Sequence, residues 1–110
     1  MEDKKLDKLY TAIEEFYESN GHSPDVYDKE DDGVKTIVIS NGWDTERYGW
    51  ASSYMEVNIE TGKGTLTIEY EYGDVDIDEE ITIDLAGEDL EAIAEDFYEN
   101  ENESAMGVEY

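Results

Sequence analysis

Acidic side chains alternate with apolar ones along one stretch of the chain, where Asp74, Asp76, Asp78 and Glu80 are separated by single residues. On an extended strand, residues i and i+2 point to the same face, about 6.6 Å apart. The alternation therefore predicts a regular row of carboxylates. Glu69 and Glu71 would extend the row onto a neighbouring strand. Regular anionic rows are what a DNA- or RNA-binding groove receives from a phosphate backbone.

A second row of carboxylates follows helical spacing, with Glu91, Glu95 and Glu99 each four residues apart. Like charges at this spacing destabilise a helix by roughly 0.2–0.5 kcal/mol per pair. A charge pattern that weakens its own helix suggests selection for the negative field itself. We therefore expect this helix face to take part in binding a partner, together with the strand row.

The residue types present in the sequence give little support for an enzymatic function. The chain has one histidine, His22, and no cysteine, and it lacks a Gly-rich phosphate loop and a serine motif. His22 is expected in a loop as an ordinary solvated side chain. Carboxylate pairs are so numerous that counting alone leaves a glycosidase-like pair open. With little room for a deep cleft beside the core, we predict no enzyme activity and no cofactor.

Calcium binding is the metal alternative. Asp74, Asp76 and Asp78 match positions one, three and five of an EF-hand loop, but Glu79 stands where that loop needs glycine. Position twelve is Leu85 instead of glutamate. Strand alternation explains the three aspartates more simply, so we expect no specific metal site.

The overall charge limits the possible partners. The 110 residues contain 32 Asp and Glu against seven Lys and Arg, a formal net charge of −25. All seven basic residues precede Gly64. Such a surface excludes direct binding to nucleic acid or to an anionic membrane and favours basic partners. Without cysteine or an apolar segment of about 20 residues, the chain is expected in a reducing bacterial cytoplasm.

Large aromatic side chains gather in a stretch without clear periodicity, residues 42–50, which is interpreted as a loop. Trp43, Tyr48 and Trp50 either cover one end of the core or, if exposed beside Arg47, have the composition of an interface hot spot. The sequence leaves both interpretations open.

The elements that must position these residues follow from hydrophobic periodicity. Steps of three and four residues predict helices over 3–20 and 87–100, and residues 21–33 are interpreted as an exposed loop. Alternation predicts a strand over 34–40 and three more between Tyr54 and Leu85. A turn at Gly62-Lys63 would pair Ile59 with Leu66 and Met55 with Tyr70, and a second turn at Gly73-Asp74 would pair Leu66 with Ile81. Glu79 breaks the pattern and is expected in a bulge or at the rim.

The predicted fold is α+β: a helix, a four-stranded antiparallel sheet and a helix, with both helices on one face of the sheet. Residues 1–100 would form a single acidic domain, and residues 101–110 a polar, flexible C-terminal tail. An exposed edge strand at 34–40 or 75–85 would permit a homodimer by strand pairing.

In size, charge and lack of catalytic motifs, the chain resembles small acidic anti-defence proteins of phages and mobile elements. These include DNA mimics that block restriction enzymes and several anti-CRISPR proteins. The resemblance is carried by the acidic stretch 69–80 and the helix 88–99, and it transfers no residue role. It implies a non-enzymatic inhibitor that occupies the basic groove of a CRISPR effector or restriction nuclease. The alternative is an acidic structural, adaptor or salt-adapted domain without mimicry.

Overall fold

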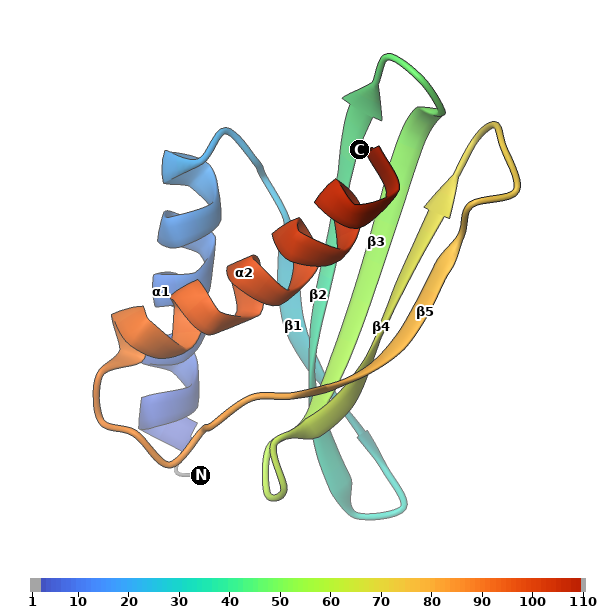
Figure 1. The fold of residues 1–110 in the computed structure, drawn as a ribbon. Coiled ribbons are helices and arrows are strands. Elements are labelled where there is room, and N and C mark those ends of the chain that lie inside the picture. Colours follow the sequence, from blue (N-terminus) through green and yellow to red (C-terminus); the bar gives the residue numbers. More distant parts are fainter. Residues whose placement is uncertain (1–2, 110) are drawn as a thin grey trace.

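The computed structural model describes residues 3–109 and folds them into two helices and an antiparallel sheet (Figure 1). The α+β class is therefore as predicted. The elements in chain order are α1 (Asp3–Ser19), β1 (Asp25–Asp31), β2 (Val34–Thr45), β3 (Gly49–Asn58), β4 (Lys63–Tyr70), β5 (Ile77–Thr82) and α2 (Leu90–Glu109).

The sheet has five strands in the order β1-β2-β3-β4-β5, so the prediction of four strands was wrong. The missed strand is β1, which lies in the stretch interpreted as a loop. β1 is an edge strand with mostly exposed, charged side chains, so it lacks the alternation that marks a half-buried strand. Asp32 and Gly33 join it to β2, and both have positive φ (53° and 78°), as a type I′ hairpin turn requires. The Asp-Gly pair was the local signal for this hairpin.

The stretch 42–50 is a β-hairpin and not an irregular loop. β2 extends to Thr45, β3 begins at Gly49, and these two residues pair across a three-residue turn. The strand predicted at 34–40 is therefore longer at its C-terminal end. It is also an interior strand, since β1 pairs along its other side, and the edges of the sheet are β1 and β5.

The central strands exist where alternation placed them, but their register differs. Met55 pairs with Leu66 instead of Tyr70, and Leu66 pairs with Glu79 instead of Ile81. The first hairpin is shifted by four residues and the second by two, so the side chains that lie within the observed strands keep their predicted faces. Glu79 is an exposed rim residue in a continuous ladder, and its Oε2 accepts a hydrogen bond of 2.8 Å from Ser104 Oγ of α2.

Both helices cover the same face of the sheet, as predicted, and the core lies between them and the strands (Figure 1). α1 buries one stripe, Leu6, Leu9, Ile13 and Tyr17. It ends as expected at Asn20-Gly21, where Gly21 takes a φ of 85°. The Tyr10 hydroxyl donates 2.7 Å to the Asp28 carboxylate, which ties α1 to the edge strand β1.

The second helix begins later and ends later than predicted. α2 runs from Leu90 to Glu109, so the tail expected at 101–110 is helical through Glu109, and Tyr110 lies outside the described residues. The helix continues because its buried stripe continues. Glu101 and Ala105 follow Phe97 at four-residue steps, and they are only 3% and 7% exposed. Because one residue of this buried stripe is a glutamate, the apolar pattern in the sequence ended too early and the helix was predicted too short.

Candidate functional site: the open face of the sheet

The face of the sheet opposite the helices carries every second side chain of each strand. We call it the open face. Across the strands it presents a mixture of carboxylates, aromatic rings and two lysines, one on the edge strand β1 and one at the start of β4: Tyr27, Lys29, Val38, Trp50, Tyr54, Glu56, Lys63, Glu69, Asp78 and Glu80. It is therefore less uniformly acidic than the sequence predicts.

The predicted row of four carboxylates is only half formed. Asp78 and Glu80 lie exposed on β5, but the strand begins at Ile77, so Asp74 and Asp76 belong to the preceding connection. Asp76 folds back, and its Oδ1 accepts a hydrogen bond of 3.0 Å from the Tyr70 backbone N–H. Its carboxylate stabilises the turn between β4 and β5 instead of extending the row.

The two glutamates predicted on the neighbouring strand also differ in role. Glu69 is exposed on β4 opposite Ser52, so it remains a member of the acidic face. Glu71 lies beyond the end of β4, and its Oε1 accepts a hydrogen bond of 3.2 Å from the Trp50 backbone N–H. The carboxylates that the structure brings together on the open face are thus Glu69, Asp78 and Glu80, on adjacent strands.

One of the two lysines of the open face, Lys29, is neutralised within the sheet. Lys29 on β1 forms an ion pair with Glu56 on β3, reaching across β2, and its ammonium lies 5.8 Å from the Tyr54 ring centroid. The hydrogen bond from Lys29 lowers the pKa of the Glu56 carboxyl, and the same bond raises the pKa of Lys29. Val38, directly opposite Glu56 in the sheet, is fully buried although it lies outside the main core.

The three aromatic residues of the 42–50 stretch divide between the two faces. Trp43 and Tyr48 are half-buried against the core, and the Tyr48 ring lies 5.7 Å from that of Tyr70. Trp50 is 51% exposed on the open face, and its indole covers Gly42, where an added Cβ would lie 2.5 Å from Cζ2. The core interpretation is therefore right for Trp43 and Tyr48, whereas Trp50 is available for contact.

The acidic row of the second helix is exposed but lies in the other layer of the molecule. Glu91, Glu95 and Glu99 project from α2, which packs on the covered face of the sheet (Figure 1). Desolvation raises the pKa of Glu99, and the neighbouring Glu95 carboxylate adds to the effect. One flat contact with the open face cannot also reach this row, so the two predicted rows do not form one surface.

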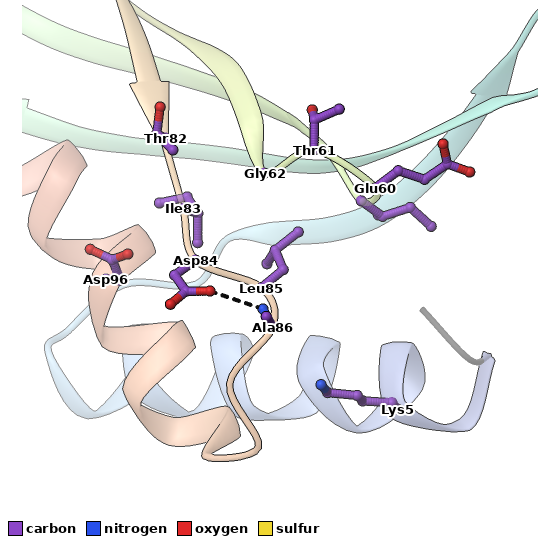
Figure 2. Close-up of a pocket in the computed structure, with 11 residues that line it drawn as sticks. Lys5, Glu60, Thr61, Gly62, Thr82, Ile83, Asp84, Leu85, Ala86 and Asp96 are labelled. Atoms are coloured by element: carbon purple, nitrogen blue, oxygen red, sulfur yellow. Dashed lines mark hydrogen bonds between the residues drawn. The ribbon is translucent and has the colours of Figure 1, made fainter.

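A hollow of about 850 Å³ lies between the β3–β4 turn, the β5–α2 connection and α1 (Figure 2). Its polar groups are largely engaged in local structure. The Asp84 carboxylate accepts the Ala86 backbone N–H at 3.1 Å, and Lys5 Nζ donates to the Gly87 carbonyl at 2.9 Å. Figure 2 shows the Glu60 carboxylate directed away from Asp84 and Asp96, so the acidic side chains here do not converge on one point.

Two further residues differ from expectation. His22 is half-buried, with its Nδ1 3.3 Å from Asn41 Nδ2 and its ring against Tyr17, Trp43 and Tyr98. His22 lies in the connection between α1 and β1, as predicted, but the prediction that it is solvated was wrong. Glu101, assigned to the tail, is buried beside it. Its four-residue spacing from Phe97 and Ala105 was the only sequence signal for this position.

Among residues 3–109, no group of three or more His, Cys, Asp or Glu side chains is arranged to hold a metal ion. Within the same range, neither helix is long and apolar enough to cross a bilayer. Comparisons of the chain with protein-family models, with curated proteins and with solved structures found no match.

Proposed function

We propose that the protein is a non-enzymatic inhibitor that mimics nucleic acid and occupies the basic DNA- or RNA-binding groove of a partner, such as a CRISPR effector or restriction nuclease. One observation carries the proposal. The open face joins exposed carboxylates of two adjacent strands to half-exposed aromatic rings, while Lys29 on its β1 edge is already paired with Glu56.

The chemistry of such a face complements a nucleic-acid groove. Glu69, Asp78 and Glu80 can substitute for phosphates opposite Lys and Arg side chains. Trp50 and Tyr54, 51% and 37% exposed, offer ring faces on which arginine stacks. The net charge of −25 would steer association at long range, so binding should be fast and sensitive to salt.

Charge reversal on the two acidic surfaces tests the proposal with a matched control. Replacing Glu69, Asp78 and Glu80 by lysine should abolish binding to the partner. The triple replacement of Glu91, Glu95 and Glu99 by lysine changes the net charge equally on the opposite layer and should leave specific binding in place. The partner is first recovered from bacterial lysate on the immobilised protein and must be displaced by DNA or RNA. Mimicry by the open face would be refuted if both variants lost binding to the partner equally, or if DNA and RNA did not displace the partner from the immobilised protein.

The distribution of charge favours one second candidate, an acidic structural, adaptor or salt-adapted domain. Carboxylates cover both layers of the molecule, and several of the predicted row serve turns instead of a binding face. This candidate predicts that the sheet-face variant keeps its biological function and becomes more stable at low salt. Thermal unfolding of both triple variants over a range of salt concentrations distinguishes it from mimicry.

A further inference from the structure

A second, smaller pocket of about 180 Å³ lies on the helix-covered side of the molecule, away from the open face. It opens between α2, the end of α1 and β2. The residues that line it include His22, Trp43, Tyr98, Glu101 and Met106. The proposed function uses none of these residues, so a ligand bound in this pocket would act independently of the open face.

One residue of this lining, Glu101, carries a carboxylate and is almost completely buried. Glu101 is 3% exposed, its Oε2 accepts a hydrogen bond of 3.1 Å from the Tyr17 hydroxyl, and its Oε1 accepts one of 2.8 Å from Asn41 Nδ2. The ion pairs among residues 3–109 are Lys29–Glu56 and Lys35–Asp3, so neither neutralises Glu101. The basic side chain near this carboxylate is His22, so among the described residues Glu101 has no lysine or arginine partner of the kind that usually accompanies a buried carboxylate.

Burial raises the pKa of Glu101, while interactions with Asn41, Ser53, Tyr17 and His22 counteract part of the rise. Keeping an ionised carboxylate here costs folding free energy, which an apolar or amide side chain would avoid. A cation that enters the pocket would recover this cost, because it interacts with the carboxylate where water does not screen it.

The walls of the pocket suit an organic cation. The His22 ring meets the Trp43 ring edge-on at 5.9 Å between centroids, and the Tyr98 ring lies 6.0 Å away on another side. Aromatic faces attract poorly hydrated cations, and tryptophan does so most strongly. Met106, 44% exposed, adds a flexible and polarisable thioether to the lining.

The same geometry argues against other cations. A metal ion needs several oxygen ligands, and the pocket has one carboxylate. A guanidinium binds best through two parallel hydrogen bonds to a carboxylate, but both Glu101 oxygens already accept bonds from within the protein. A quaternary, trimethylated ammonium has no N–H group and so needs no hydrogen bond; it requires only a nearby negative charge and aromatic surfaces.

We infer that the pocket lined by His22, Trp43, Tyr98 and Glu101 is a binding site for a methylated ammonium group, with Glu101 as its counter-ion. Such a group is carried either by a small quaternary amine or by a methylated lysine of a protein. Both present the same cationic head, so one probe tests the site and a peptide then separates the sources.

The test uses choline and its neutral carbon isostere, 3,3-dimethylbutan-1-ol, at equal ionic strength. In a Trp50→Phe background Trp43 is the only tryptophan, so its fluorescence reports the pocket alone. We expect a saturable change with choline and none with the isostere. Equal responses to both would show an apolar cavity without a cation site and would overturn the inference, as would no response to choline.

Two variants separate the pocket from the general negative field. Glu101→Gln keeps the side-chain shape and should weaken choline binding by on the order of tenfold or more. Glu103→Gln removes the same charge from an exposed position two residues away and should leave binding unchanged. Equal weakening in both would overturn the inference. If Glu101→Gln does not fold, the comparison of choline with its neutral isostere, made on the protein that retains Glu101, still tests whether the pocket binds a cation. A trimethyl-lysine peptide and its unmodified form then identify the source of the head group.

Discussion

The Asn41 side-chain amide donates a hydrogen bond of 2.8 Å to the Glu101 carboxylate, joining the middle of β2 to the second half of α2 across 60 positions of sequence. Both side chains are buried, at 8% and 3% exposure. Because an unpaired buried carboxylate would be very costly, this contact fixes where the end of α2 lies on the sheet. The small pocket and the length of the helix both depend on it.

Removing the other donor to this carboxylate should destabilise the fold measurably. Tyr17 is fully buried, and its hydroxyl donates to Glu101 at 3.1 Å. Tyr17→Phe keeps the ring and deletes one hydrogen bond to a charged group, so we expect a loss of about 1–3 kcal/mol in the free energy of unfolding. Urea unfolding measures it. In a Glu101→Gln background the same substitution should cost less, and an equal cost in both backgrounds would contradict the assigned hydrogen bond.

Glu101 should also make stability depend on pH. In the unfolded chain it titrates near the ordinary glutamate value of about 4.3, whereas burial raises its pKa in the native state. Between these two pKa values the native state holds the proton more tightly, so stability falls as the pH rises through that window. The other titratable groups around it are Tyr17, His22 and Tyr98.

Urea unfolding of the unaltered protein and of Glu101→Gln at a series of pH values isolates this contribution. The difference in unfolding free energy should grow in favour of the variant from acid toward neutral pH. The Glu103→Gln variant controls for the general loss of one negative charge. A difference that is constant with pH would mean that Glu101 titrates at its ordinary value.

The sequence predicted the fold class, the two helices on one face and the side-chain faces of the central strands, because those features follow from periodicity. It did not predict register, since alternation is unchanged when a strand slips by an even number of residues. Met55 has an apolar partner whether it pairs with Leu66 or Tyr70, so the pattern could not choose between them. The turn that begins with Asn58, whose Oδ1 accepts the Glu60 N–H at 2.8 Å, selects the observed pairing.

The candidate site was predictable only in part, and for a related reason. A sequence pattern places carboxylates along a strand, but it cannot show which of them accept hydrogen bonds from backbone N–H groups. Asp76 accepts the Tyr70 N–H and Glu71 the Trp50 N–H, and both hydrogen bonds depend on the position of the β4–β5 turn. Glu101 was missed because a charged residue in a buried stripe resembles an exposed tail until its partners on α1 and β2 are known.

Repulsion along α2 should limit the stability of the domain. Glu99 lies among the carboxylates of Glu95, Asp96 and Glu103, and they contribute to its raised pKa. Glu99→Lys turns repulsive contacts into attractive ones, so the thermal midpoint should rise at low salt. At about 1 M NaCl, where the screening length is about 3 Å, most of the gain should disappear. Circular dichroism melts at both salt concentrations measure it, and a gain that persists in high salt would point to helix propensity instead.

The close approach of β3 and β4 at Gly64 should tolerate no side chain. Gly64 pairs with Val57, and an added Cβ would lie 1.8 Å from the Glu56 carbonyl oxygen, a backbone atom that cannot move without breaking the ladder. Gly64→Ala should therefore reduce the free energy of unfolding by about 3 kcal/mol or more. Gly87→Ala is the matched control, because an added Cβ there meets nothing within 4 Å, and it should change stability by about 0.5 kcal/mol or less. Similar effects of the two substitutions in urea unfolding would show that β3 and β4 do not pair in this register, and the positions of Glu56 and Glu69 on the open face would change with it.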